Sequence, residues 1–339
     1  MIDPIISEDI KDISDNLDIP FFKDKEILIT GGAGFLGSYL CDLFVSLGSY
    51  VSCLDNFSTS TLENIDHLTK MKNFRLLRED VSKIAIKETF NYIFHLSSRA
   101  SPEDYQLHPV ETLITNSVGS NETLKLAVKG NSRILFASSS EIYGDPQAIP
   151  TSEDYWGNVN PVGVRSCYDE GKRFGEALFM AYRRQYGLDI RITRIHNTYG
   201  PRIRSDGNYA RALPRFIDQA LKGEDITVYG DGSQTRSFCY VSDTIRGIIA
   251  AIYNDRAEGE VFNIGNPYEI SILGLAEKIK ELTHSTSKIV FRPLPEDDPK
   301  RRSPSILKAK KRLNWQPKIS LEDGLKRTIK WFKIANQNL

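Results

Sequence analysis

The sequence predicts an α/β fold in which a doubly wound parallel sheet carries a smaller C-terminal lobe. Short runs rich in Val, Ile, Leu and Phe alternate with segments of helical periodicity from residue 25 to about residue 200. The runs are apolar along their whole length, which is typical of strands that are buried on both faces. A glycine-rich loop follows the first run and opens the first helix, as in dinucleotide-binding folds of the Rossmann type.

The expected strands follow one another along the chain with helical patterns between them. After the glycine loop, the first helix is expected from Ser38 to Leu47. Beyond residue 200 the alternation loosens, and the segments 201–224 and 267–318 carry Gly, Pro and charge, as loops and helices of a second lobe would. The six strands that the pattern predicts are residues 26–30, 50–55, 74–77, 92–96, 133–137 and 189–194.

The first 24 residues are acidic and carry apolar residues at near-helical spacing. We expect a short amphipathic helix that packs on the body of the protein or on a neighbouring subunit; a disordered leading segment is the alternative. The apolar positions are Ile5, Ile6, Ile10, Ile13 and Leu17. The expected organisation is an N-terminal extension (1–24), a dinucleotide-binding domain (25–188, with returns near 189–200 and 236–265) and a second lobe (201–235 and 266–333).

Composition excludes several classes of function. Forty-four basic and forty-four acidic side chains balance, which argues against nucleic-acid binding by bulk electrostatics. The four cysteines and five histidines are scattered, with no spacing typical of ligands, so neither a metal site nor a disulfide framework is expected. No run approaches the roughly 20 apolar residues that span a bilayer, and the start lacks a secretion signal. We therefore expect a soluble, cytoplasmic protein with no membrane partner.

The loop Gly31-Gly-Ala-Gly-Phe-Leu-Gly37 has the spacing of a dinucleotide site. Gly31 permits the tight turn, Gly34 lets a pyrophosphate approach the backbone, and Gly37 allows close packing of helix on strand. Asp55 ends the second strand about 20 residues on, where a carboxylate accepts from a ribose hydroxyl and repels a 2′-phosphate. NAD is therefore favoured over NADP. Asp80 and Val81 follow the third strand and would contact the adenine. The spacing is equally consistent with an aspartate that only stabilises a turn.

Tyr168 and Lys172 form a Tyr-x-x-x-Lys pair, which places a phenol and an ammonium on one helix face. The ammonium would stabilise the phenolate, so that the tyrosine can exchange protons near neutral pH. A hydroxyl from the run Ser138-Ser139-Ser140 could complete a site around one substrate oxygen. Beside a nicotinamide, this arrangement oxidises an alcohol to a ketone and reduces it again. The pair alone can arise by chance, but together with the glycine loop and the serines it indicates a redox site.

These motifs resemble the extended short-chain dehydrogenase/reductase family and, within it, the UDP-glucuronate decarboxylases (UDP-xylose synthases). The resemblance runs from about residue 25 to residue 333. The stretch 140–173 is its most specific part and is the one that indicates decarboxylation. The matching segments are residues 31–38, 55–57, 95–102, 140–173, 197–202, 232–236, 240–243 and 297–302.

The resemblance implies bound NAD, a nucleotide-sugar substrate with UDP-glucuronate favoured, and a homodimer formed through helices that include the Tyr–Lys helix. It assigns catalysis to Ser139, Ser140, Glu141, Tyr168, Lys172 and Arg302. Cofactor binding falls on Gly31, Gly34, Phe35, Leu36, Gly37, Asp55, Asn56, Asp80, Val81, Leu96, Tyr168 and Lys172. Substrate binding falls on Asn197, Arg202, Arg236 and Tyr240.

The implied reaction oxidises the sugar at C4, releases CO2 from the resulting β-keto acid and returns the hydride. Glu141, next to a substrate carboxylate, would have a raised pKa. Arg302 would orient that carboxylate, although the charge pattern alone favours a solvated basic run, Lys300-Arg301-Arg302. The alternatives are a UDP-glucuronate 4-epimerase or a nucleotide-sugar 4,6-dehydratase on the same scaffold and, more distantly, a non-catalytic NAD-binding scaffold protein.

Overall fold

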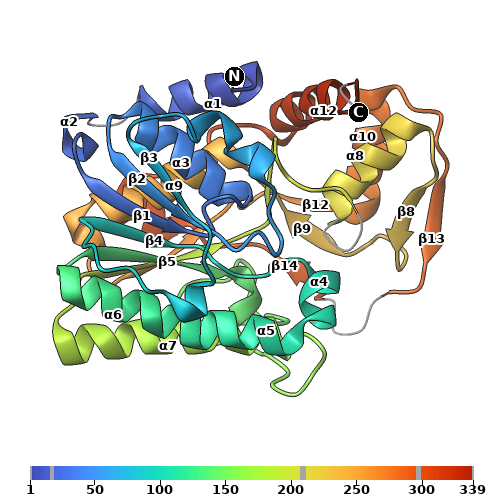
Figure 1. The fold of residues 1–339 in the computed structure, drawn as a ribbon. Coiled ribbons are helices and arrows are strands. Elements are labelled where there is room, and N and C mark those ends of the chain that lie inside the picture. Colours follow the sequence, from blue (N-terminus) through green and yellow to red (C-terminus); the bar gives the residue numbers. More distant parts are fainter. Residues whose placement is uncertain (1, 16–18, 207–210, 295–298, 338–339) are drawn as a thin grey trace.

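A seven-stranded sheet forms the centre of the molecule (Figure 1), in a computed structural model that describes residues 2–15, 19–206, 211–294 and 299–337. Across the sheet lie β11 (Val261–Ile264), β6 (Ile190–Ile195), β5 (Arg133–Ser139), β4 (Tyr92–His95), β1 (Glu26–Thr30), β2 (Tyr50–Leu54) and β3 (Phe74–Leu77). All neighbouring pairs are parallel, which confirms the predicted fold class. The order reverses between β1 and β4, and ligands of such sheets bind outside the carboxyl ends of the strands at this point.

Two strands differ most from the pattern read in the sequence, whereas β2, β4 and β6 differ from their predicted bounds by one residue. The strand β5 extends to Ser139, two residues beyond the predicted end, because the hydrogen-bonded register with β6 continues through the serines. The strand β11 is not among the six expected strands. Its four residues include the polar Asn263, which interrupts the apolar run that would have marked it.

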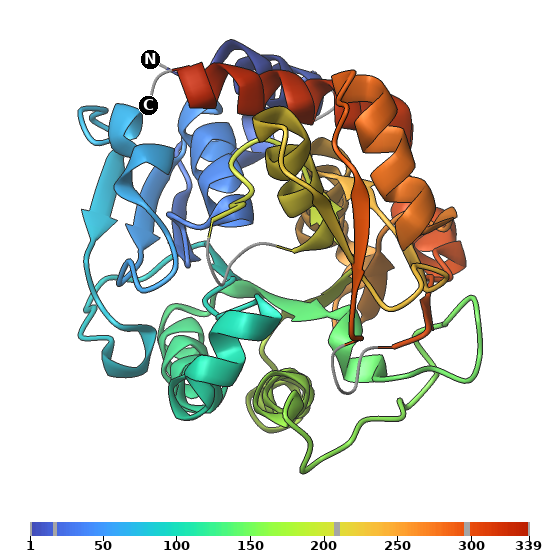
Figure 2. The same cartoon turned by 90° about the vertical axis from the view of Figure 1, so that its right-hand side faces the viewer.

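Helices cover both faces of the sheet (Figures 1 and 2). On one face lie α3 (Phe35–Ser46) and α9 (Val241–Tyr253), and on the other lie α6 (Ser120–Gly130) and α7 (Ser166–Tyr186). The short α5 (Pro109–Ile114) runs through a π-helical turn into α6. The buried side chains accordingly form two main clusters, one containing Leu40 of α3 and the other Phe179 of α7.

A smaller lobe lies beside the sheet, at the right of Figure 1. In it α8 (Ala212–Lys222) packs on α10 (Ile272–Thr283), and β8 (Ile226–Tyr229) pairs with β13 (Ile289–Arg292). A three-stranded sheet has β9 (Thr235–Ser237) between β12 (Glu269–Ser271) and β14 (Arg301–Arg302). The remaining elements are α2 (Ile19–Phe22), α4 (Pro102–Leu107), β7 (Thr198–Tyr199), β10 (Cys239–Tyr240), α11 (Leu307–Leu313) and α12 (Leu321–Gln337). Within the described ranges, no helix has both the length and the apolarity that crossing a membrane requires.

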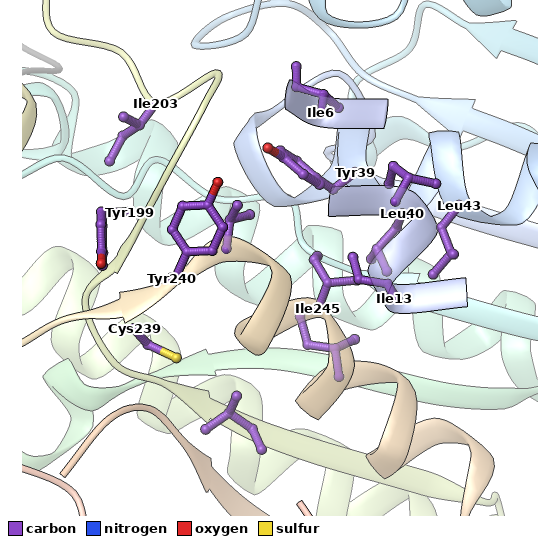
Figure 3. Packing of buried hydrophobic residues seen from close by; sticks show 14 of the residues in the cluster. Ile6, Ile13, Tyr39, Leu40, Leu43, Tyr199, Ile203, Cys239, Tyr240 and Ile245 are labelled. Carbon is purple, nitrogen blue, oxygen red and sulfur yellow. The ribbon is translucent and has the colours of Figure 1, made fainter. Parts of the chain in front are cut away.

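The N-terminal segment contains α1 (Pro4–Ser14), which packs on its own chain. The helix begins where the carboxylate of Asp3 accepts a hydrogen bond from the backbone N–H of Ile5 at 2.8 Å. Its apolar face, formed by Ile5, Ile6, Ile10 and Ile13, is buried against α3 and α9, while Leu17 lies outside the described residues. Figure 3 shows Ile6 and Ile13 among side chains of α3 and α9.

The buried carboxylate of Asp9 connects α1 to three other elements. It accepts hydrogen bonds from the hydroxyls of Tyr39 at 3.3 Å and Tyr240 at 2.8 Å, and it forms an ion pair with Arg327 at 2.9 Å. Burial raises its pKa to about 6, against the lowering effect of these three partners. The helix is therefore held to α3, β10 and α12 by a polar cluster inside an apolar surrounding.

Asp9→Asn is expected to change how the stability of the protein depends on pH. Because the folded protein binds the Asp9 proton more tightly than the unfolded chain does, the free energy of unfolding falls as the pH rises from about 4 to about 6. The Asn variant should lack this decrease, which is on the order of 3 kcal/mol. Urea denaturation across that range measures it, with the exposed Glu8→Gln on the same helix as control. Equal slopes in the wild type and the Asn variant would contradict the expectation.

Candidate active site

The glycine loop joins β1 to α3 at the carboxyl edge of the sheet. Gly31 has a φ of +70°, and a Cβ there would lie 2.9 Å from the backbone nitrogen of Ser97. A Cβ at Gly37 would lie 2.1 Å from the carbonyl oxygen of Gly31. The loop therefore requires glycine for its turn and for the close approach of helix to strand, and the N-terminus of α3 opens toward the space beyond it.

A cavity of about 360 Å³ lies in front of this loop, at the point where the strand order reverses. The structure brings all the predicted cofactor-binding residues to its wall: Gly31, Gly34, Phe35, Leu36, Gly37, Asp55, Asn56, Asp80, Val81, Leu96, Tyr168 and Lys172. These residues come from the ends of separate strands and from α7. Their convergence, together with the glycine backbone that leaves room for a phosphate group, fits a bound dinucleotide.

Asp55 also forms hydrogen bonds within the protein that hold the glycine loop. Its carboxylate accepts a hydrogen bond from the backbone N–H of Ala33 at 3.0 Å and another from the Ser60 hydroxyl at 2.8 Å. It therefore fixes the shape of the glycine loop besides facing the cavity. Asp80 accepts a hydrogen bond from the side chain of Asn56 at 3.0 Å, so these two cavity residues hold each other in place.

The serine run and the Tyr–Lys pair meet deeper in the same cavity. Ser139 ends β5, and its hydroxyl accepts a hydrogen bond from the backbone N–H of Glu141 at 3.2 Å and interacts with the Tyr168 hydroxyl. The ammonium of Lys172 donates to the carbonyl oxygen of Ala137 at 2.9 Å and lies 5.8 Å from the centre of the Tyr168 ring. Ser140 is buried at the start of the 3₁₀ turn that follows. A phenol, a hydroxyl and an ammonium thus line the same cavity.

The pKa values at this position differ from the expectation that Lys172 brings Tyr168 close to neutrality. Burial raises the pKa of Tyr168 to about 12, although the hydrogen bond with Ser139 and the charge of Arg211 lower it. Burial also lowers the pKa of Lys172 to about 7. In this geometry burial is the largest influence on the pKa of both groups, because both side chains are almost completely enclosed.

Glu141 lies between two guanidinium groups. Its Oε2 accepts from Arg165 Nη2 at 2.5 Å, and its Oε1 accepts from Arg302 Nη1. Burial raises its pKa, but the charges of Arg302 and Arg165 outweigh burial and hold the pKa well below the usual range. The expected increase in the pKa of Glu141 is therefore wrong for this geometry, since two cations face the carboxylate.

Arg302 and its neighbour Arg301 have opposite environments. Arg301 is exposed and pairs with Glu269 at 2.7 Å, as a member of a solvated basic run would. Arg302 is only 3% exposed, and it also donates to the carbonyl oxygen of Gly144 at 3.2 Å. The two residues alternate across β14, and pairing with β9 directs Arg302 inward beside Arg236. The solvated-run interpretation is thus wrong for Arg302.

A second cavity of about 310 Å³ lies beside the first, between the sheet and the smaller lobe. Glu141 and Asn197 belong to the walls of both cavities. Arg302, Arg236 and Arg165 line the second. A molecule that spans both cavities would therefore pass the Glu141 side chain, close to Ser139 and Tyr168.

Two predicted substrate-binding residues lie elsewhere. Arg202 lines the first cavity instead of the second and forms a buried ion pair with Asp42 of α3 at 2.6 Å. Tyr240 lines neither cavity. Its ring packs 5.6 Å from that of Tyr199 (Figure 3), and its hydroxyl donates a hydrogen bond to Asp9. Arg202 and Tyr240 are thus each bound to a buried carboxylate that is distant in the sequence.

Three residues of the site were not singled out in the sequence. Arg165 lies one helical turn before Tyr168, a spacing that would have placed it on the same face. Tyr105 stacks on Tyr168, with ring centres 5.1 Å apart and planes 5° apart, and its buried hydroxyl makes no hydrogen bond within the described structure. Arg211 lines both cavities and donates to the carbonyl oxygen of Ala100 at 2.6 Å. Nothing in the pattern around Tyr105 or Arg211 marks them.

Residues 27–265 match the family model described as the NAD dependent epimerase/dehydratase family. The chain is 47% identical over 318 residues to UDP-glucuronic acid decarboxylase 1 of Arabidopsis thaliana, with 93% of this chain and 72% of that protein covered. It is 48% identical over 308 residues to UDP-glucuronic acid decarboxylase 1 of Danio rerio, covering 91% and 72%.

Solved structures with other activities share the fold. A UDP-glucose 4-epimerase of Thermotoga maritima, solved with UDP-glucose, superposes with a TM-score of 0.85 at 30% identity. A UDP-glucuronic acid 4-epimerase of Bacillus cereus, solved with UDP-glucuronic acid and NAD, superposes with a TM-score of 0.83 at 29% identity. Each comparison covers 91% of this chain and 99% of the other.

Proposed function

The chain belongs to the NAD dependent epimerase/dehydratase family, and from this membership we propose that it is a UDP-glucuronate decarboxylase that converts UDP-glucuronate to UDP-xylose and regenerates NAD. The observation that carries the proposal is the position of Arg302. Its buried guanidinium lines the second cavity and pairs with Glu141, whose side chain also lines the first cavity together with Ser139 and Tyr168. A decarboxylase needs such a cation next to a redox site, because the carboxylate that leaves is attached to the carbon beside the oxidised one. The 47–48% identity to decarboxylases supports the same substrate.

The two cavities divide the binding of cofactor and substrate. Residues 25–188, with the returns near 189–200 and 236–265, hold NAD in the first cavity. The nucleotide sugar occupies the second, against residues 201–235 and 266–333. Gly31, Gly37 and Asp55 fit a dinucleotide through the close backbone approach and the hydrogen-bonded loop already described. When bound, NAD accepts the hydride from C4 of the sugar and later returns it.

Tyr168 transfers the proton of the sugar hydroxyl, and together with Ser139 it stabilises the negative charge that develops on the ketone oxygen. Tyr168 takes the proton of the C4 hydroxyl as the phenolate, the form that burial disfavours in this geometry, and Ser139 donates a hydrogen bond to the same oxygen. The 4-ketone then lies β to the sugar carboxylate. When the bond between C5 and the carboxylate breaks, CO2 leaves and the electron pair passes to the ketone oxygen as an enolate, which Ser139 and Tyr168 stabilise. Protonation at C5 and reduction at C4 complete the pentose.

Incubation of the purified protein with UDP-glucuronate and NAD tests the proposal. We expect a product that is lighter by one CO2 and shows a pentose anomeric signal, measured by mass spectrometry and proton NMR. An unchanged mass with a new configuration at C4 would instead mean a 4-epimerase, the activity that the Bacillus cereus protein carries in its name. A Tyr168→Phe sample serves as the control for background hydrolysis.

We also infer a homodimer that forms through α5 and α7. Apolar side chains gather on the outer surface of these packed helices, including Val110 (67% exposed), Leu113, Val118 in the π-helical turn, and Phe174 of α7 (48% exposed). Exposed apolar side chains on neighbouring helices are typical of an interface between subunits. Phe174→Glu is expected to convert the protein to a monomer in light scattering, whereas Leu307→Glu, at a more exposed apolar site on α11, should not. Unchanged mass in the Phe174 variant would contradict the inferred interface.

A further inference from the structure

Two guanidinium groups on the wall of the second cavity share one carboxylate. Arg165 is 8% exposed and Arg302 is 3% exposed. Each forms an ion pair with a different carboxylate oxygen of Glu141. A single carboxylate neutralises one of these two cations. Buried charges are strongly unfavourable without counter-charges. This part of the wall therefore has one positive charge that the Glu141 carboxylate does not neutralise, and it could bind a second anion.

The other carboxylate nearby compensates for this excess only weakly. Oδ2 of Asp169 is 4.0 Å from Nε of Arg165, beyond hydrogen-bonding distance, and its Oδ1 is buried without a partner in the described structure. Burial and the charge of Glu141 raise the pKa of Asp169 to about 7. The Nε of Arg302 is likewise buried with no acceptor among the described residues. The two arginines therefore keep an unused hydrogen-bond donor, Nε of Arg302, and a positive charge that no carboxylate of the described residues fully neutralises.

We propose that Arg165 is a second arginine for the carboxylate of the sugar, which it binds together with Arg302, and that Glu141 is an internal carboxylate that occupies this pair until substrate arrives. The inference rests on the proposed function and names the residue that selects a uronic acid over a neutral hexose. Its position supports the role. Arg165 lies directly before α7, one turn ahead of Tyr168, so a carboxylate at Arg165 sits next to the group that handles the C4 hydroxyl. C4 and the carboxylate-bearing C5 are neighbours in the sugar.

Ligand binding without turnover tests this role. Titration calorimetry would compare the Kd for UDP-glucuronate with that for UDP-glucose, which differs only at C6. Arg165→Gln should weaken UDP-glucuronate binding about tenfold or more and change UDP-glucose binding by less than about threefold. The exposed Arg184→Gln on the same helix is the matched control and should change neither.

The outcomes separate this inference from the proposed function. If the wild type prefers UDP-glucuronate and Arg165→Gln keeps that preference, the role of Arg165 is overturned while the decarboxylase stands. If the wild type binds both sugars equally, the uronate substrate and the arginine pair are both wrong. Loss of the preference in Arg165→Gln but not in Arg184→Gln supports the inference, whatever the rate of CO2 release.

A second variant distinguishes binding from a purely structural role in which Arg165 only holds Glu141. Glu141→Gln removes the internal carboxylate and should tighten the binding of UDP-glucuronate, although turnover falls. In that background, Arg165→Gln should still weaken UDP-glucuronate binding about tenfold. An Arg165 that acts only through Glu141 would give no further loss in the double variant, and that result would overturn the proposal. The double variant also lacks the unpaired Glu141 charge that could impair folding of the single one.

Discussion

Tyr168→Phe is expected to lower kcat by about 10²–10⁴-fold, the range that loss of a positioned general acid–base group produces. The Tyr168 hydroxyl interacts with Ser139, and the Tyr168 ring stacks on Tyr105. The centre of this ring lies 5.8 Å from the ammonium of Lys172. The Phe ring keeps this packing and removes only the hydroxyl. NAD binding, followed by fluorescence titration, should therefore change little while decarboxylation nearly stops.

Tyr182→Phe provides the matched control for Tyr168→Phe. Tyr182 lies on the same helix, and its hydroxyl donates to Asn121 at 2.8 Å, away from both cavities. It should retain the activity of the wild type. A Tyr168→Phe enzyme with more than about a tenth of the parental kcat would show that another group takes the C4 proton.

Arg302→Ala is expected to lower the rate of CO2 release about a hundredfold or more, since truncation of one partner of a buried charge pair removes several kcal/mol of interaction. The loss has two causes. The sugar carboxylate loses a guanidinium, and Glu141 is left with Arg165 alone. Release of CO2 from carboxyl-labelled UDP-glucuronate measures the effect directly.

The neighbouring Arg301→Ala removes the same side chain from an exposed position and should keep the parental rate, because Arg301 pairs with Glu269 at the surface. Thermal melting of both variants checks that they are folded. Equal rates for Arg302→Ala and Arg301→Ala would remove Arg302 from the mechanism and return it to the solvated run that the charge pattern suggests.

The glycine loop and the Tyr–Lys pair could be predicted because their geometry is local. Gly31 to Gly37 span one turn and the start of one helix, and Tyr168 and Lys172 share a face of α7 by helical periodicity alone. The predicted substrate-binding residues that lie outside the second cavity have partners that are distant in the sequence. Tyr240 is bonded to Asp9, 231 residues away, and Arg202 pairs with Asp42, 160 residues away. No spacing along the chain reveals such contacts.

The sequence by itself determined the fold class, the dinucleotide loop and the pairing of Tyr168 with Lys172, because short-range periodicity and backbone requirements specify them. Only the tertiary structure decided which of two adjacent arginines faces inward, since this depends on the register of β14 against β9. Only the tertiary structure brought Arg165 to Glu141 and Arg302, and it also set the pKa directions of Glu141 and Tyr168. Burial and the charges of side chains up to 161 residues apart govern those values, and both arise only when the chain has folded.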